Sequence, residues 1–295
     1  MPLEPIPKMM GDALKGRYAV GYFESWNLES LQGTLDAAES ANAPIIIGFN
    51  GEFLSREGRK AEERLSLYAE LGKEAARAVN VSCGLIFNEC PNDEWVERAA
   101  MAGFNLVMPA DASAPLKDYT RRVKALTDLA HQCGASVEAE IGELPCASSG
   151  TVKPGGSLTD PDVAARFVEE TKVDLLAVSV GNVHIRVKGE QGLNLERLAQ
   201  IHSKVPVPLV LHGGSGISAD SLVKAIGLGV AKVNYGTYLK QRYLKAVREA
   251  LDHRASNPHE LLGMGGEADV MVAGRLAVRD AVLERIGMLG CCGRS

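Results

Sequence analysis

Two of the six histidines lie at the ends of short apolar runs that are typical of buried strands. His184 follows the run Leu175–Val180, and His212 ends the run Pro208–His212. The carboxylate of Glu89 lies just past a third run. Two neutral imidazoles and one carboxylate form a common zinc-binding set that leaves a position open for water or substrate. A lone histidine of this kind more often bonds to the backbone, but two in neighbouring units favour a metal site.

A glycine-rich turn follows the run that ends in His212. Gly213, Gly214 and Ser215 stand where the chain leaves a strand for a helix, and Asn234–Thr237 takes the corresponding place after the next run. Glycines in such a turn let backbone N–H groups point toward an anion at the start of the following helix. The two turns therefore predict a phosphate site, with a plain glycine-capped turn as the alternative.

Regular elements must position these residues, and eight apolar, β-branched runs recur along the chain. Runs of this length suit strands that are buried on both faces. Amphipathic stretches lie between them, among them Glu57–Ala78 and Lys117–Gln132. Asp160 before Pro161, and Ser218, indicate helix starts. The predicted strands are Ala19–Phe23, Pro44–Phe49, Val81–Phe87, Leu106–Ala110, Ser136–Ile141, Leu175–Val180, Pro208–His212 and Lys232–Tyr235.

Eight strands that alternate with helices predict a parallel sheet, and the count of eight favours closure into an α/β barrel, the (β/α)8 TIM barrel. A doubly wound open sheet is the alternative fold. We expect residues 1–295 to form one domain, with an irregular C-terminal extension from about residue 255 to residue 295. The segment Cys146–Thr159 is rich in Ser, Gly and Pro and is typical of an active-site loop.

Composition excludes several classes of partner. The net charge is −5 and no basic tract is present, so a nucleic-acid partner is not expected. No apolar run approaches the roughly 20 residues that cross a bilayer, and the N-terminus lacks the apolar core of a signal peptide. The six cysteines show no CxxC spacing, which favours a reduced, cytoplasmic protein.

Several motifs, taken in order, resemble the class II fructose-bisphosphate and tagatose-bisphosphate aldolase family. The resemblance runs from about Tyr18 to about Thr237. It is carried by YAVGYFESWNLESLQGTLDAAESANAPIII, AGFNLVM, SVEAEIGEL, LTDPDVAARFVEETKVDLLAVSVGNVH, LVLHGGSGI and KVNYGT.

The resemblance implies a divalent metal, usually zinc, that polarises the ketone of dihydroxyacetone phosphate and stabilises an enediolate. It also implies a phosphorylated substrate, a homodimer or homotetramer, and a monovalent cation as a further candidate. His184 and His212 match the two metal histidines after strands six and seven. The stretch that holds Glu138 and Glu140 matches one that neighbours the metal, which makes Glu138 a further candidate ligand and Glu140 a candidate catalytic residue. The implied phosphate-binding residues are Gly181, Gly213, Gly214, Ser215, Asn234, Gly236 and Thr237.

Several positions depart from the family's pattern, and four of them are candidate site residues. The family motif His-x-Asp-His on strand three falls on a stretch ending in Asn88 and Glu89. An amide does not titrate near neutral pH, so Asn88 cannot replace a general acid–base, although it can bond to a substrate hydroxyl. A carboxylate is an acceptable ligand, but Glu89 would favour Mn²⁺ or Mg²⁺ more than histidine does. Glu24 replaces an Asn after strand one, and Asn50 replaces a Ser after strand two.

Three functions remain open at the level of sequence. The first is a metal-dependent aldolase-type lyase with a substrate other than fructose bisphosphate, in which Glu24, Glu89 or Glu140 assists proton transfer and Asn50 contacts substrate. The second is an isomerase or epimerase that uses the same enediolate chemistry. The third is a non-catalytic aldolase paralogue, which would explain the loss of the aspartate and of a metal histidine.

Overall fold

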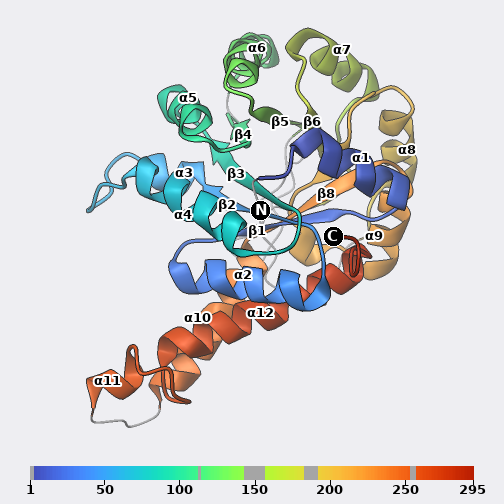
Figure 1. Cartoon of the computed structure of the whole chain (residues 1–295). Coiled ribbons are helices and arrows are strands. Elements are labelled where there is room, and N and C mark those ends of the chain that lie inside the picture. The colour runs from blue at the N-terminus through green and yellow to red at the C-terminus, as the bar shows by residue number, and fades with distance from the viewer. Residues whose placement is uncertain (1–2, 112–113, 143–156, 183–191, 253–256) are drawn as a thin grey trace.

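Eight parallel strands close into a barrel in which each strand bonds to its neighbours in chain order, and β8 returns to β1. The computed structural model describes residues 3–111, 114–142, 157–182, 192–252 and 257–295. Figure 1 shows helices surrounding the barrel. The strands are β1 Val20–Glu24, β2 Ile45–Asn50, β3 Cys83–Cys90, β4 Leu106–Pro109, β5 Ser136–Ile141, β6 Leu175–Val178, β7 Leu209–Leu211 and β8 Val230–Tyr235.

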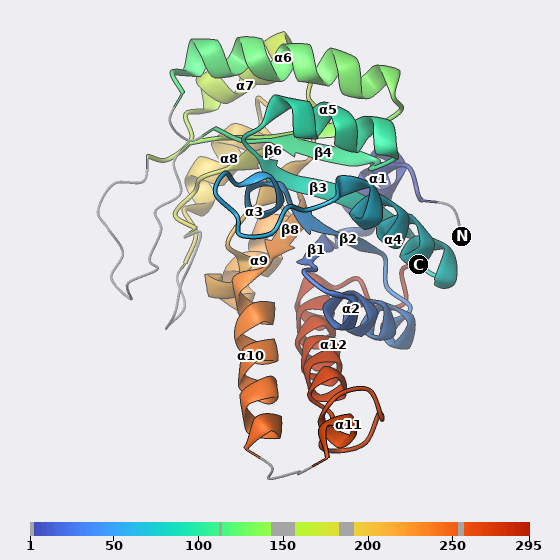
Figure 2. The same ribbon diagram turned by 90° about the vertical axis from the view of Figure 1, so that its left-hand side faces the viewer.

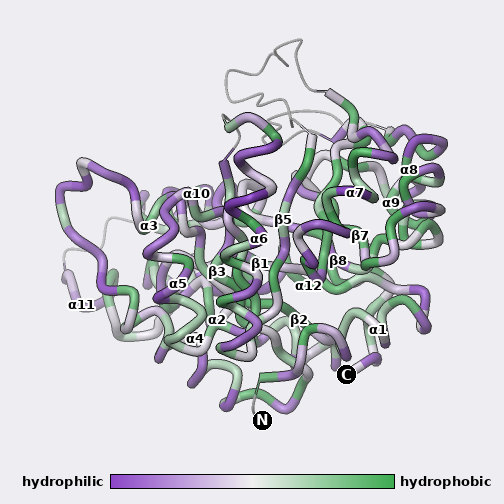
Figure 3. The backbone as a smooth tube through the Cα atoms, turned by 90° about the horizontal axis from the view of Figure 1, so that it is seen from above, coloured by the Kyte–Doolittle hydropathy of each residue, from purple (hydrophilic) through white to green (hydrophobic). Residues whose placement is uncertain are grey.

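The strands are buried almost throughout, as the apolar runs predicted. Hydrophobic residues follow the strands in Figure 3, and hydrophilic residues lie mainly on the outer helices and loops. The helices are α1 Ile6–Gly16, α2 Leu28–Ala41, α3 Gly51–Ser55, α4 Leu65–Ala78, α5 Asp93–Ala102, α6 Leu116–Gln132, α7 Pro161–Thr171, α8 Leu195–His202, α9 Ala219–Ile226, α10 Thr237–Leu251, α11 Pro258–Leu261 and α12 Val270–Leu289, with a short 3-10 turn, η1, over Gly214–Gly216.

The barrel and all eight strands confirm the predicted fold class, with strand ends that differ from the predicted ones by at most three residues. Both predicted helix starts are also confirmed. The Asp160 side chain caps α7 by accepting from the backbone N–H groups of Asp162 and Val163, and Ser218 caps α9. None of the helices in the described part of the chain is long and apolar enough to span a bilayer.

One predicted helix is shorter than its sequence pattern indicated. The helix expected over Glu57–Ala78 begins only at Leu65. Gly58 adopts a left-handed backbone conformation, with φ of 75°, and the guanidinium of Arg59 donates to the carbonyl of Phe53 at 2.7 Å. These local bonds hold the charged stretch before Leu65 outside the helix.

The C-terminal segment carries a long helix where we expected irregular structure. Helix α12 spans 20 residues and packs between α2 and α10, and Figure 2 shows α10 and α12 extending side by side away from the barrel. The Arg275 guanidinium binds both oxygens of Asp36 on α2, at 2.6 and 2.7 Å. Apolar residues lie on several faces of α12, which masks the helical period in the sequence.

We expect the stability of α12 to depend on the charge of its cap, Asp269. Its carboxylate accepts from the backbone N–H groups of Gly263, Gly265 and Met271 at 2.8–2.9 Å, and these bonds hold its pKa below the ordinary value. Because the pKa of Asp269 is lower in the folded than in the unfolded protein, its ionised carboxylate stabilises the fold at pH values above the unfolded-state pKa. This stabilisation is lost as the pH falls through the folded-state pKa. Asp269→Ala should cost about 1 kcal/mol at pH 7. Urea unfolding at pH 7 and pH 3 should show that the difference in free energy of unfolding between wild type and Asp269→Ala is smaller at pH 3. An equal difference at both pH values would contradict the prediction.

Candidate metal and substrate site

His212 lies at the carboxyl end of β7, surrounded by three glutamates from two other strands. Its Nε2 is 2.9 Å from Oε1 of Glu138, and its Nδ1 is 3.3 Å from Oε1 of Glu89 and 3.6 Å from Oε2 of Glu140. The imidazole is almost completely buried. The structure thus brings together four of the residues singled out from the sequence.

Alternation along β5 explains two of the three glutamates. Side chains two residues apart on a strand point to the same face, so Glu138 and Glu140 both face the barrel interior. Glu138 is completely buried and lies 2.7 Å from the ammonium of Lys232 on β8. Burial alone would raise the pKa of Glu138, but Lys232 and His212 outweigh it and hold that pKa below its ordinary value. Glu138 is therefore an anion that orients His212.

An irregularity in β3 accounts for the third glutamate. Strict alternation would send Asn88 inward and Glu89 outward. The register of β3 against β4 shifts between Phe87 and Cys90, and Glu89 adopts a left-handed backbone conformation with φ of 54°. Such a bulge redirects a side chain, at a cost in backbone strain that is characteristic of functional sites. As a result both Asn88 and Glu89 face the site, and the Asn50 amide donates to Glu89 at 2.9 Å.

The charges around His212 favour a cation. Burial alone would lower the pKa of His212, but Glu140, Glu138 and Glu89 raise it to about 10. Three carboxylates gather negative charge around this imidazole, and one of them, Glu138, is also paired with the ammonium of Lys232. A divalent cation would compensate that charge and would displace the proton from the imidazole.

The donor positions also fit a metal. Two ligands of a tetrahedral ion, each about 2.1 Å from the metal, lie about 3.4 Å apart. Glu89 and His212 meet this spacing, and the bond from Nε2 to Glu138 leaves Nδ1 as the ligand atom. Among the described residues no group of three or more His, Cys, Asp or Glu side chains is arranged to hold a metal ion. The predicted third ligand, His184, lies outside the described residues.

A cavity of about 280 Å³ opens beside His212 at the carboxyl ends of β1, β2, β3 and β8. Sequence reasoning did not single out Tyr22, Glu52, Phe53 or Lys240, which also line it. The predicted residues on its wall are Glu24, Asn50, Asn88, Glu89, His212, Gly213, Ser215, Asn234, Gly236 and Thr237.

The predicted glycine turn after β7 packs closely onto β8. Gly213 is left-handed, with φ of 66°, and η1 follows. A Cβ on Gly214 would lie 2.6 Å from Val233 and 2.7 Å from Tyr235, so only glycine lets this turn pack onto β8. Helix α10 begins at Thr237, on the same wall of the cavity, and its N-terminus favours an anion.

A charged pair, Glu24 and Lys240, crosses the mouth of this cavity. The Lys240 ammonium donates to the Glu24 carboxylate and lies over the ring of Phe53, 4.5 Å from its centroid. A Cβ on Gly236 would lie 2.2 Å from Glu24 Oε2, so the glycine in the turn after β8 is what makes room for Glu24. No motif pointed to Lys240, because it lies one helical turn beyond the predicted phosphate site.

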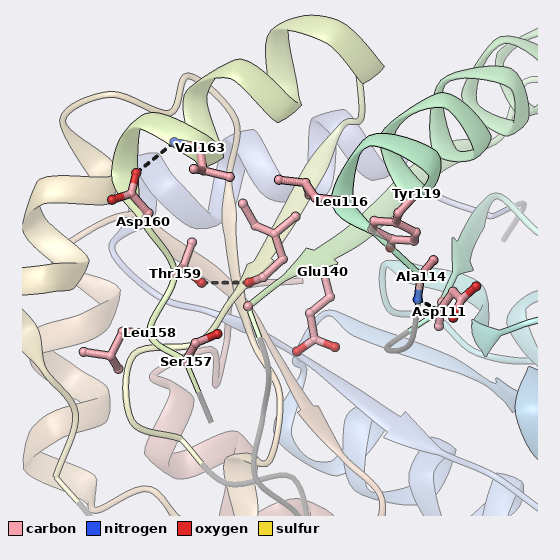
Figure 4. A pocket seen from close by; sticks show the side chains of 13 residues that line it. Asp111, Ala114, Leu116, Tyr119, Glu140, Ser157, Leu158, Thr159, Asp160 and Val163 are labelled. Carbon is pink, nitrogen blue, oxygen red and sulfur yellow. Dashed lines mark hydrogen bonds between the residues drawn. The ribbon is translucent and has the colours of Figure 1, made fainter. Parts of the chain in front are cut away.

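A second cavity, of about 520 Å³, is lined by Glu140, whose Oε2 lies 3.6 Å from Nδ1 of His212 on the wall of the first cavity. Figure 4 shows Glu140 extending into it, with Asp111 and Tyr119 on one side and Ser157 and Leu158 on the other. The remaining predicted residue, Gly181, lines neither cavity and has a left-handed φ of 97°. The loop expected over Cys146–Thr159 is described only from residue 157.

Comparisons with known proteins identify curated relatives of this chain. The chain is 33% identical over 273 residues to fructose-bisphosphate aldolase from Geobacillus stearothermophilus, covering 91% of this chain and 93% of that one. It is 35% identical over 288 residues to the uncharacterized protein YdjI of Escherichia coli K12, covering 96% of each.

Solved structures show the same likeness. The crystal structure of the YdjI aldolase from Escherichia coli K12 superposes with a TM-score of 0.83 at 32% identity and covers 100% of this chain and 99% of that one. A putative fructose-1,6-biphosphate aldolase from Coccidioides immitis gives a TM-score of 0.82 at 26% identity, with 98% and 97% covered. The profile of the family described as fructose-bisphosphate aldolase class-II matches residues 4–294. This chain belongs to the class II fructose-bisphosphate aldolase family.

Proposed function

We propose that this protein is a metal-dependent carbon–carbon lyase that cleaves a phosphorylated ketose other than fructose bisphosphate. The observation that carries the proposal is His212 held among Glu89, Glu138 and Glu140, next to a glycine-lined turn. Glu89 and His212, together with His184, would hold a divalent cation. That cation, when bound, would polarise the ketone of the substrate.

The chain's own residues would fix the substrate around that cation. The turn over Gly213–Ser215 and the start of α10 at Thr237 would bind the phosphate of the ketone half. Glu138 keeps the His212 ring oriented through its bond to Nε2. Asn50 orients Glu89 in the same way from the other side of the site.

Cleavage of a ketose requires a base for the hydroxyl next to the breaking bond. That hydroxyl loses its proton and becomes a carbonyl, while the electrons of the carbon–carbon bond pass to the ketone half as an enediolate. Asn88 cannot accept the proton, because an amide does not titrate. Glu24 lines the same cavity and carries a carboxylate, so we assign the proton transfer to Glu24.

The metal assignment predicts a measurable loss in Glu89→Ala. Removing one of three ligands should reduce the metal content of the purified protein by at least tenfold, and Glu89→His should retain metal, because imidazole is a good zinc ligand. Elemental analysis measures both. Glu94→Ala, which removes an exposed carboxylate on α5, is the control. Unchanged metal content in Glu89→Ala would refute the ligand role of Glu89.

The identity of Asn88 favours a second candidate, an isomerase or epimerase that forms the same enediolate without cleaving a bond. The two functions separate on one experiment with a panel of phosphorylated ketoses in D₂O. Cleavage products support the lyase. Exchange of solvent deuterium into dihydroxyacetone phosphate, without cleavage of any ketose, would support the second candidate and overturn the first.

A further inference from the structure

The carboxylate of Glu24 lies beside the turn after β8 that we expect to bind the substrate phosphate. The register pairs Phe23 of β1 with Tyr235 of β8. The residues that follow them, Glu24 and Gly236, are therefore neighbours at the carboxyl ends of the two strands. A Cβ on Gly236 would lie 2.2 Å from Glu24 Oε2. Because Gly236 and Thr237 belong to the predicted phosphate site, Glu24 brings a negative charge next to the place of an anion.

The ammonium of Lys240 lies against Glu24 and is surrounded by aromatic rings. It donates to Glu24 Oε1 and lies 4.5 Å from the ring centroid of Phe53 and 5.7 Å from that of Trp26. The faces of aromatic rings attract a cation, so both rings favour this position of the ammonium. The Trp26 ring in turn packs edge-on against Tyr243, one turn further along α10, with centroids 5.4 Å apart. The surroundings thus hold the ammonium at the carboxylate.

The helix that carries Lys240 does not account for a lysine at this position. Lys240 is the fourth residue of α10, and the N-terminal end of a helix dipole disfavours a cation. Its side chain is 31% exposed, whereas that of Lys245 on the same helix is 70% exposed. Among the described residues that line the cavity beside His212, Lys240 is the only lysine or arginine. These features favour a role for Lys240 in the site rather than in the helix.

Resting on the proposed function, we propose that Lys240 is the positioning residue and counter-ion of Glu24, which lets a carboxylate base lie beside the phosphate of the ketone half. The pair of Glu24 and Lys240 carries no net charge, so it does not repel the phosphate. Without Lys240 the carboxylate would lose the cation that faces it, and two like charges so close together repel each other.

This role differs from a direct bond between Lys240 and the phosphate, and the two roles predict opposite results in a double variant. If Lys240 acts through Glu24, removing the carboxylate as well should abolish the effect of removing the ammonium. If Lys240 bonds the phosphate itself, the loss should persist without Glu24. Such non-additivity is the signature of two residues that act as a unit.

The test measures the Kd of dihydroxyacetone phosphate for the metal-loaded protein by titration calorimetry at pH 8, with metal content measured in parallel. Lys240→Met keeps an apolar stem but removes the charge, and it should weaken binding at least about fivefold. Lys240→Arg keeps a cation over the aromatic rings and should bind within about twofold of wild type. Glu24→Gln combined with Lys240→Met removes both charges and should restore binding to within about twofold of wild type.

Two further measurements separate this role from a purely structural one. The double variant binds the phosphate ester but lacks the base, so its kcat for condensing dihydroxyacetone phosphate with glycolaldehyde should stay at least about 100-fold below wild type. Lys245→Met is the matched control: it makes the same substitution on the same helix, in an exposed pair with Glu249 outside both cavities. It should leave both the Kd and the kcat unchanged.

The outcomes distinguish this inference from the function on which it rests. Failure of the wild-type protein to bind dihydroxyacetone phosphate would overturn the proposed function, and the inference with it. Equally tight binding in wild type and Lys240→Met would overturn the counter-ion role alone. Weak binding that persists in the double variant would also overturn that role, since Lys240 would then act on the phosphate without Glu24. Wild-type turnover in the double variant would overturn the assignment of Glu24 as the base.

Discussion

Lys232→Met should lower the free energy of unfolding by about 3–5 kcal/mol, the largest loss of stability that we expect from a single substitution near the site. The ammonium of Lys232 is fully buried, 2.7 Å from Oε2 of Glu138, and also donates to Oδ1 of Asn234. Removing it leaves the Glu138 carboxylate buried without its nearest cation. Urea unfolding at pH 7 measures the change.

The reason for this loss can be tested with a double variant. Glu138→Gln removes the buried charge but keeps an amide that can still bond to His212. Combined with Lys232→Met, it should recover a large part of the lost stability, because the penalty comes from an uncompensated charge rather than from lost packing. A loss below about 1 kcal/mol in Lys232→Met, or no recovery in the double variant, would argue against this account.

The ion pair also explains why the site tolerates so much negative charge. Glu138 bonds to His212 on one side and to Lys232 on the other, so one carboxylate of the three is already compensated inside the barrel. Glu89 and Glu140 lie on the Nδ1 side of His212, 3.3 and 3.6 Å from that nitrogen. Lys232 therefore acts on the proposed metal site indirectly, by pairing with the carboxylate that orients His212.

The sequence predicted the fold well because a parallel barrel repeats one strong signal. The strands are short and mainly apolar, as in Ile45–Asn50, and they are buried on both faces. The signal failed where tertiary contacts decide the structure. Helix α12 is stabilised by α2 and by the Arg275–Asp36 pair rather than by a clear amphipathic period. The stretch before Leu65 is held by side-chain bonds that no periodicity records.

Site residues could be predicted where sequence spacing or a motif alone determines the face to which a side chain points. Glu138 and Glu140 stand two residues apart on one strand, so both had to share a face. Glu89 reaches the same site only because β3 is irregular between Phe87 and Cys90, which alternation would not suggest. Lys232 and Tyr22 were missed because both lie inside apolar runs, where a buried polar residue has no local signature.

Asn88→Asp should raise the rate of fructose-bisphosphate cleavage by roughly 100-fold or more over wild type. The position is buried and lines the cavity, and an aspartate there would supply a titrating group where the present amide offers none. A positioned acid–base group is worth about 10²–10⁴ in rate. Carbon–carbon cleavage of fructose bisphosphate is followed through the triose phosphates released at pH 8, with metal content measured in parallel.

Asn50→Asp provides the matched control for that gain. Asn50 is the register partner of Asn88 on β2 and lines the same cavity, so the substitution adds the same charge to the same space. Its amide, however, donates to Glu89, and an aspartate would repel that carboxylate instead. We therefore expect Asn50→Asp to lose metal and gain no cleavage. Equal gains in both variants would mean that added charge, rather than proton transfer at position 88, limits the reaction. No gain in Asn88→Asp with metal retained would mean that Asn88 is not what separates this protein from a fructose-bisphosphate aldolase.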